Sequence, residues 1–334
     1  MAEASPARGR WISLTIGICI SVACIWFIVQ KIDFEQVKIA FERFEWRYFA
    51  AGVASLAFGY AMRILRWSKI LNAAGSSVTF RQCVAPFLGS ITLNNVLPLR
   101  LGDVVRALVF PTSIGVSRTT ATTSLVMERL VDLMTLLICL ALSLALSRHI
   151  AAPEWLKETA MSLAIAGTVV LVAIFLLSGA IAAGLENSPK KPIQAAVLLL
   201  KSFEAMSRTP VLATLFSLSL LVWLGEAGLF YSLLIGFGLP ATPTAAIIIM
   251  AIATLATLVP SSPGYVGPFH LAAFAGIALL GGSNDQAASF AVLSHLGLWV
   301  PTTIAGAIAI ASAPKMFGGL RRLRAGEKAG SKII

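Results

Sequence analysis

The stretch VLATLFSLSLLVWLGEAGLFYSLLIGFG, residues 211–238, contains a single charged side chain, Glu226. It is longer than the roughly 20 apolar residues with which an α-helix crosses a hydrocarbon core of about 30 Å. Other apolar runs lie near residues 11–30, 48–65, 84–99, 121–147, 158–184, 243–259, 265–281 and 287–313. The pattern predicts an all-α integral membrane protein with about eight hydrophobic spans and additional re-entrant or broken helices.

Composition supports this class, because 57% of the 334 residues are apolar and only 12% are charged. So little polar surface cannot cover a water-exposed globule. Cys19, Cys24, Cys83 and Cys139 have no ligand-like spacing, and no G-x-x-x-x-G-K-[ST] run occurs. We therefore expect no disulfide framework, metal, cofactor or nucleic-acid partner, and no direct coupling to ATP hydrolysis.

The distribution of basic residues predicts the orientation, since Lys and Arg concentrate at cytoplasmic membrane ends. An uncleaved first helix and hairpins at 84–99 and 243–281 place most basic residues on one side. On the other side lie Lys31, Lys38, Arg43, Arg47, Arg148 and Lys157. Both termini are expected in the cytoplasm of a plasma (cell inner) membrane, with a transmembrane domain at 1–314 and a basic tail at 315–334. Whether 243–281 is a re-entrant hairpin or two full spans stays open.

Residues 33–48 form an amphipathic pattern on the predicted outer side. Phe34, Val37, Phe41, Phe44 and Tyr48 recur at helical spacing between charged residues. Such a helix either rests in the membrane interface or packs on the helical bundle.

Two short apolar segments end in breaks that combine Pro and Gly. In LPLRLGD, residues 97–103, Gly102 follows Pro98 by four residues, and in VPSSPGYVG, residues 259–267, Gly264 follows Pro260 in the same way. Pro263 and Gly267 complete the second motif. Matched breaks of opposite entry side indicate an inverted repeat lining a polar site near the midplane. The alternative is that the same residues end helices at surface loops.

Ionisable residues inside apolar segments are costly and mark functional sites or structural ion pairs. Glu128, Arg129 and Asp132 can share one helix face, where Arg129 can neutralise one carboxylate, and Arg100 or Arg106 could supply a further cation. Glu226 is a candidate proton-coupling group or a buried, hydrogen-bonded carboxyl. Asn94, Asn95, Arg100, Asp103 and Arg106 surround the first break, and Arg63 and Arg66 end the second apolar segment.

Four motifs in order resemble the lysylphosphatidylglycerol-synthase transmembrane-region family. They are RILRW at 63–67, NNVLPLRLGDVVR at 94–106, ERLVD at 128–132 and PSSPGYVG at 260–267. Members often carry an acidic residue shortly after the last motif, where this chain has Phe269 and His270. The chain resembles the stand-alone form, without the soluble domain that aminoacylates lipid, so no enzymatic activity is expected.

The resemblance implies a flippase-like membrane domain that moves a lipid between leaflets, such as an aminoacylated phospholipid, a glycolipid or a lipid-linked sugar. Membrane lipids would be the partners, and Arg63, Arg66, Asn94, Asn95, Arg100, Asp103 and Arg106 would contact the headgroup. Two alternatives stay open. One is a non-transporting accessory protein of a lipid-modifying enzyme, and the other is an intramembrane headgroup transferase.

Overall fold

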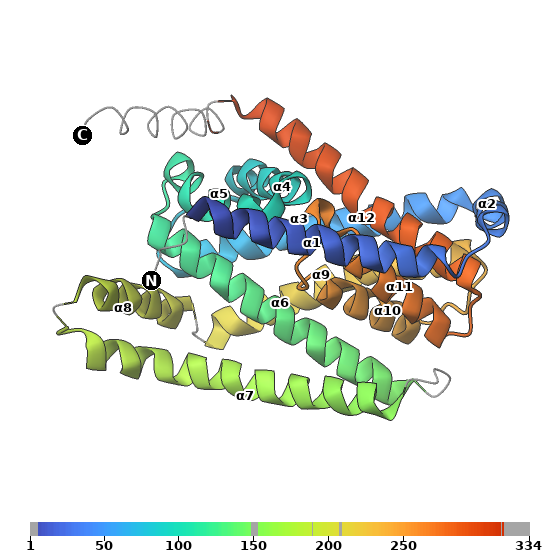
Figure 1. The fold of residues 1–334 in the computed structure, drawn as a ribbon. Helices are drawn as coiled ribbons and strands as arrows, with labels where there is room; N and C mark the ends of the chain where they lie inside the picture. Colours follow the sequence, from blue (N-terminus) through green and yellow to red (C-terminus); the bar gives the residue numbers. More distant parts are fainter. Residues whose placement is uncertain (1–5, 148–152, 189, 207–208, 315, 317–334) are drawn as a thin grey trace. The chain divides into compact units, whose positions relative to one another are not determined.

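The computed structural model describes residues 6–147, 153–188, 190–206, 209–314 and 316. Within these residues the chain is helical and contains no strand, which confirms the expected fold class (Figure 1). The α-helices are α1 (Pro6–Val29), α2 (Phe34–Arg43), α3 (Trp46–Ala73), α4 (Phe80–Val96), α5 (Leu101–Leu108), α6 (Arg118–Leu146), α7 (Glu154–Leu185), α8 (Lys191–Met206), α9 (Thr209–Gly236), α10 (Pro243–Ala256), α11 (Pro268–Leu279) and α12 (Asn284–Ser312). Three 3-10 helices are η1 (Pro98–Arg100), η2 (Pro111–Ile114) and η3 (Pro263–Tyr265). The predicted basic tail lies outside the described residues, apart from Met316.

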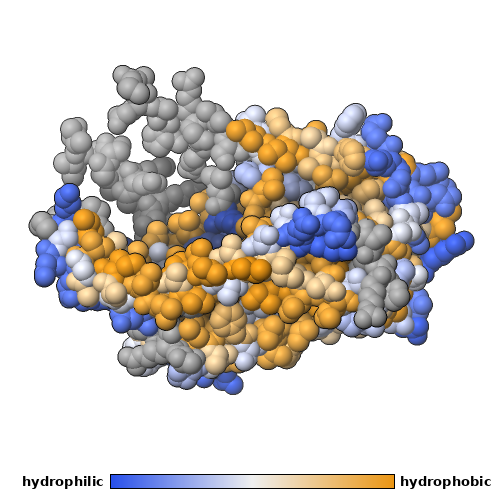
Figure 2. Space-filling model, turned by 90° about the horizontal axis from the view of Figure 1, so that it is seen from below, coloured by the Kyte–Doolittle hydropathy of each residue, from blue (hydrophilic) through white to orange (hydrophobic). Residues whose placement is uncertain are grey.

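Five described helices, α3, α6, α7, α9 and α12, are long and apolar enough to cross a membrane. A sixth span is possible if α1 and α2, which meet at 85°, count as one bent pair. Large apolar side chains point outward, for example Val169 and Leu176 of α7, which are 62% and 75% exposed. Figure 2 shows apolar residues over much of the visible face. A surface of this kind is stable in lipid and not in water, so the chain is a multi-pass membrane protein.

The chain folds as two compact units, each assembled from three segments. Unit 1 comprises Met1–Tyr60, Leu133–Gly167 and Leu220–Pro301, and unit 2 comprises Ala61–Asp132, Thr168–Ser219 and Thr302–Ile334. The boundaries fall inside long helices rather than in loops. Each unit contains one hairpin of short helices, which is α10 and α11 in unit 1 and α4 and α5 in unit 2.

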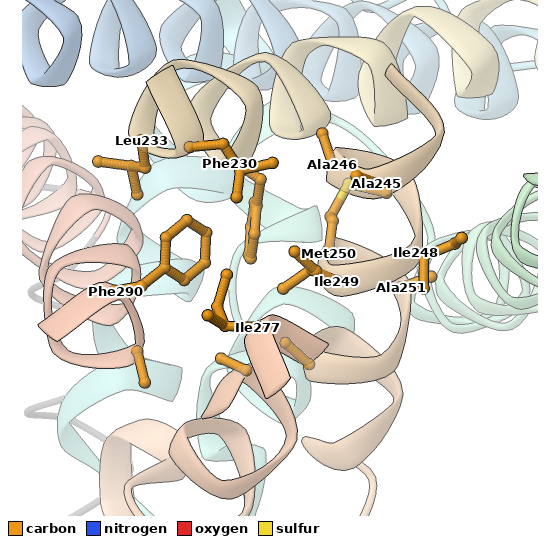
Figure 3. Packing of buried hydrophobic residues seen from close by; sticks show 14 of the residues in the cluster. Phe230, Leu233, Ala245, Ala246, Ile248, Ile249, Met250, Ala251, Ile277 and Phe290 are labelled. Carbon is orange, nitrogen blue, oxygen red and sulfur yellow. The ribbon is translucent and has the colours of Figure 1, made fainter. Parts of the chain in front are cut away.

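The core of unit 1 lies among α9, α10, α11 and α12 (Figure 3). Phe230 and Phe290 have ring centroids 6.0 Å apart, and Ile249 and Ile277 are fully buried beside them. Gly276 permits a close approach of α11 to α10, since a Cβ there would lie 3.0 Å from Ile249 Cγ1. Small residues bring helices together in lipid in this way.

A close crossing of α3 and α9 follows the same rule. A Cβ built on Gly225 would lie 2.6 Å from the Cα of Gly59. The Ser55 hydroxyl donates a hydrogen bond of 2.9 Å to the Gly225 carbonyl oxygen. Small residues at this crossing therefore permit a backbone contact and an interhelical hydrogen bond.

Helix α2 confirms the amphipathic helix expected within 33–48, and its apolar side packs on unit 1. Val37 and Phe41 are partly buried against the core, and Phe44 is only 4% exposed. The Phe44 ring lies 4.6 Å from that of Phe237 at the end of α9. Phe34, in contrast, is 67% exposed. The bundle-packed alternative therefore holds for most of this apolar face.

The two hairpins are built from helices shorter than a membrane is thick. The 17 residues of α4 and 14 of α10 rise about 25 Å and 21 Å, and the 8 of α5 and 12 of α11 rise less. A span needs about 20 residues, so none of these helices is long enough to cross a bilayer upright by itself. Their lengths favour the re-entrant form of both hairpins.

Candidate functional site

The break in the unit 2 hairpin has an unusual backbone. After α4 ends, Pro98 begins η1 and Arg100 adopts a left-handed conformation, with φ of 52°. A side chain in this region costs roughly 1 kcal/mol or more, so the surrounding structure must hold it. Gly102 then brings α5 against α4, because a Cβ there would lie 1.9 Å from the Ser90 carbonyl oxygen.

Asn94 and Asp103 close this hairpin by reciprocal hydrogen bonds. The Asn94 amide Nδ2 donates to Asp103 Oδ1 at 2.9 Å, and Asn94 Oδ1 accepts the Asp103 backbone N–H at 3.1 Å. The remaining carboxylate oxygen, Oδ2, accepts a bond from Arg129 Nη2 of α6 at 2.8 Å. Asp103 therefore connects the break to the first of three ion pairs.

Asp132 of α6 forms the second ion pair and is shared by two arginines of α3. Arg66, which is 0% exposed, binds it with both terminal nitrogens, at 2.6 Å and 2.9 Å. Arg66 Nη1 also donates to the Ser219 hydroxyl at 2.6 Å. Arg63 stands farther off, with Nη1 3.6 Å from Asp132 Oδ2 and a side chain that is 12% exposed. Arg66 is therefore fixed by a bidentate pair, whereas Arg63 makes the weaker approach.

Arg106 of α5 and Glu128 of α6 form the third pair, with Nη2 to Oε1 at 2.9 Å. The guanidinium lies over the rings of Phe87 and Trp67, 4.7 Å and 5.3 Å from the ring centroids. Stacking on aromatic faces stabilises a desolvated cation. Both charged side chains are almost fully buried, so this pair braces the hairpin against α3 and α6.

We call these seven residues, Arg63, Arg66, Arg106, Arg129, Asp103, Glu128 and Asp132, the arginine cluster. Their formal charges sum to one positive charge, because four arginines are joined to three carboxylates. The Nε atoms of Arg66 and Arg106 are buried and have no hydrogen-bond partner within the described residues. The excess positive charge, in a cluster that is mostly buried, favours an anion nearby.

Asn95 lies at the edge of the cluster and binds α12. Its Nδ2 donates to the hydroxyl oxygens of Thr302 and Thr303 at 3.2 Å and 2.9 Å. On the preceding turn, Thr92 donates to the Thr303 carbonyl oxygen at 3.1 Å. These bonds fix the end of α4, so Asn95 holds the break in position against α12.

The cluster partly confirms the expected pairing of charges and partly corrects it. Arg106 was one of two candidate partners for α6 and does pair with Glu128. The sequence allowed Arg129 to neutralise one carboxylate of its own helix, but its direct ion pair is with Asp103 of α5. Glu128 and Asp132 are paired directly with arginines of α5 and α3.

Sequence reasoning missed the parts that hold the arginines in place. Trp67 Nε1 donates to the Ser124 hydroxyl at 3.1 Å, which orients the ring beneath Arg106. Ser219 and Phe87 were also not singled out. The available signal was a tryptophan in an apolar segment that also contains arginines, although the stacked cation is Arg106 and not its neighbour Arg66.

The break in the unit 1 hairpin has a related backbone but neutral partners. Pro263 begins η3, Tyr265 has φ of 61°, and Gly267 has φ of 102°. Ser21 of α1 donates to the Val266 carbonyl oxygen at 2.7 Å and accepts the Ser262 N–H at 2.9 Å. A Cβ on Gly267 would lie 2.6 Å from Ser21 Cα. Helix α1 therefore clamps this break.

Two histidines complete the second break. His295 Nε2 lies 2.7 Å from the Gly264 carbonyl oxygen, which can only accept, so Nε2 carries the proton. His270 Nδ1 accepts the Gly267 N–H at 3.4 Å. The two rings have centroids 4.6 Å apart. The two rings support the loop of the second break from α11 and α12.

The backbone also revises how the two motifs correspond. The sequence aligned Pro98 and Gly102 with Pro260 and Gly264. In the structure, Pro263 begins the 3-10 helix, and Pro260 precedes it in irregular chain. Within the described residues, Arg100 and Tyr265 are the non-glycine residues with positive φ, and each is the second residue after the proline that begins its 3-10 helix. Pro98 and Arg100 thus correspond to Pro263 and Tyr265, and Gly102 and Gly267 each follow that proline by four residues at a close backbone approach.

Glu226 lies in unit 1 and is 7% exposed. Thr254 of α10 donates a hydrogen bond of 3.3 Å to Glu226 Oε1. This is the buried, hydrogen-bonded carboxyl that was one of the two expectations, while a role in proton coupling stays a prediction. The two breaks belong to different units, so a cavity shared by both also stays a prediction.

One known protein family matches most of the chain. The model of the family described as "Lysylphosphatidylglycerol synthase TM region" matches residues 14–306. The match includes both hairpins and every residue of the arginine cluster. A search of curated proteins gives no match.

Proposed function

The chain belongs to the lysylphosphatidylglycerol synthase TM region family, and we propose that it is a lipid translocase of the cell inner membrane. Its substrate would be an anionic, aminoacylated or glycosylated lipid that passes between leaflets. The arginine cluster would receive the headgroup while the acyl chains stay in the bilayer. It would act as a carrier and not as an enzyme.

The observation that carries this proposal is the single excess positive charge of the arginine cluster. A net charge inside a membrane protein is costly unless it is neutralised. A phosphodiester carries one negative charge, so one bound headgroup would make the cluster neutral. This balance favours lipids with one phosphodiester over neutral lipids.

The four arginines would have two roles, of which one is to shape the site and the other is to contact the phosphate. Arg66 and Arg106 are held by bidentate or stacked carboxylate pairs, so they would shape the site. Arg63 approaches Asp132 at 3.6 Å and Arg129 has a side chain that is 39% exposed. These two side chains are more exposed than Arg66 and Arg106, so they are the ones that a phosphate would reach first. Arg100 would contact the headgroup from the break itself. Positioning of the phosphate by guanidinium donors is a recurrent use of arginine.

The test is leaflet exchange in proteoliposomes with fluorescent phosphatidylglycerol, its lysyl form and a lipid-linked sugar. We expect exchange of at least one lipid above protein-free vesicles. Arg63→Gln should reduce it at least about tenfold, since a charge-assisted contact contributes roughly 1.5 kcal/mol or more. Lys69→Gln is the matched control, because Lys69 is an exposed cation on the same helix.

Stability should distinguish loss of function from loss of fold. In Arg63→Gln, Asp132 keeps its bidentate partner Arg66, so the unfolding midpoint should change little. Exchange at the normal rate by folded Arg63→Gln protein would overturn the assigned role of the cluster. Absence of exchange by the wild-type protein, with and without a proton gradient, would instead favour the accessory role.

A further inference from the structure

Unit 1 contains a second polar site, whereas the arginine cluster belongs to unit 2. A pocket of about 390 Å³ lies between α2, the end of α9 and the start of α12. Its polar lining residues are Gln36, Arg43, Ser283, Asp285 and Gln286, and Phe237 forms an apolar wall. The volume lies within the range of small-molecule sites.

The pocket presents one cation and one carboxylate that are not paired with each other. Arg43 is exposed and has no ion pair or hydrogen bond within the described residues. Asp285 is held in place, because its Oδ1 accepts the Asp33 backbone N–H at 2.8 Å. No bond to its Oδ2 is found in the described part of the chain. The pocket therefore offers a guanidinium and a fixed carboxylate oxygen to one ligand.

The carboxamides of Gln36 and Gln286 add neutral donors and acceptors to the pocket lining. Gln286 Oε1 accepts the Ser283 N–H at 3.0 Å, and the Ser283 hydroxyl accepts the Gln286 N–H at 3.2 Å. This reciprocal cap fixes the start of α12 and leaves the Gln286 amide nitrogen as a donor. The site is thus rigid on the α12 side, where the carboxylate lies.

Aromatic residues indicate that the pocket lies at headgroup depth. The buried Phe44 ring contacts both Phe237 of the pocket wall and Trp46, at centroid distances of 4.6 Å and 5.2 Å. Trp46 is 56% exposed, and Phe34 at the start of α2 is 67% exposed. Exposed aromatic residues at the ends of membrane helices are typical of the membrane–water interface.

We propose that this pocket binds a zwitterionic lipid headgroup with a phosphate and a primary ammonium group. The phosphate would pair with Arg43, and the ammonium would donate to Asp285 Oδ2. An anionic headgroup would satisfy Arg43 but face the carboxylate. A quaternary ammonium has no N–H and would leave Asp285 without a hydrogen bond. The pocket should thus prefer phosphatidylethanolamine to phosphatidylglycerol or phosphatidylcholine, and this preference does not depend on transport.

The experiment uses the full chain in detergent and a phosphatidylethanolamine probe with a photoactivatable group near the glycerol. After irradiation, peptide mapping should place the label in residues 34–43 or 283–286. Excess unlabelled phosphatidylethanolamine should compete, and phosphatidylglycerol or phosphatidylcholine should compete poorly. Labelling confined to other segments, or equal competition by phosphatidylglycerol, would overturn the proposal.

Two variants and one control make the test specific. Arg43→Gln and Asp285→Asn should each reduce labelling of these peptides by about tenfold, since each removes one charge-assisted bond. Asn keeps an oxygen for the Asp33 N–H, so the fold should hold, which an unchanged unfolding midpoint would verify. Arg47→Gln is the control, because Arg47 is exposed and pairs with Glu45 outside the pocket. Undiminished labelling in both pocket variants would refute the assignment.

Discussion

The hairpins of unit 2 and unit 1 have breaks of similar backbone form, but the side chains around the two breaks differ. Each has a 3-10 helix begun by proline, a non-glycine residue in left-handed conformation, and a glycine at a close backbone approach. The first break is surrounded by charged side chains, whereas a serine and two histidines hold the second through its backbone groups. The comparison teaches that the broken hairpin is an architectural element, and that the arginine cluster gives one copy its electrostatic character.

The largest expected effect comes from breaking a buried ion pair of the arginine cluster, which includes Asp103 and Arg106 of the unit 2 hairpin. Asp132→Asn would leave Arg66 buried without its carboxylate, so unfolding free energy should fall by roughly 3–5 kcal/mol. Chemical unfolding in detergent micelles measures this loss. Glu186→Gln is a control, because Glu186 is half-exposed in its pair with Lys201. A loss below about 1 kcal/mol would mean that the arginine cluster is not a structural centre.

A glycine substitution in each break tests how far the two hairpins depend on close backbone packing. Gly102→Ala and Gly267→Ala would place a Cβ 1.9 Å from Ser90 O and 2.6 Å from Ser21 Cα. Each should cost about 2–3 kcal/mol by overpacking and strain. Gly115→Ala, at φ of 72° with open space around it, should cost only about 1 kcal/mol. Unfolding titrations of the three variants decide whether close packing or backbone strain alone dominates.

A smaller effect should follow from removing the Ser21 hydrogen bonds that hold the second break. Ser21→Ala removes one hydrogen bond to Val266 O and one from Ser262 N, so a loss of about 1–2 kcal/mol is expected. Hydrogen exchange should increase at residues 260–267 and stay constant at residues 97–103. Ser217→Ala, at an exposed position on α9, provides the control. Equal exchange at both breaks would contradict a local clamp.

The smallest structural effect is expected for a variant of Glu226. Such a variant tests proton coupling without a large change in packing. Glu226→Gln keeps an oxygen for the Thr254 hydroxyl, so stability should change by less than about 0.5 kcal/mol. Leaflet exchange with and without a proton gradient then reads the function of the carboxyl. If the gradient stimulates the wild-type protein and this variant equally, Glu226 does not couple protons.

Much of the fold followed from local properties of the sequence. Apolar runs of about the length of a bilayer crossing or more predicted α3, α6, α7, α9 and α12, and short runs ending in Pro and Gly predicted both hairpins. The amphipathic pattern predicted α2. These features are readable because helix periodicity, span length and helix termination depend on residues near one another in the chain.

The sequence by itself determined the membrane class, the helices and which segments contain buried charge. Only the tertiary structure decided that Arg66 binds Asp132, that Arg129 binds Asp103, and that Pro263 rather than Pro260 corresponds to Pro98. Several arginines were equally plausible partners for each carboxylate on charge alone. The choice among them depends on which helix faces meet and on backbone angles at the breaks, and neither is encoded in the spacing of residues along one helix.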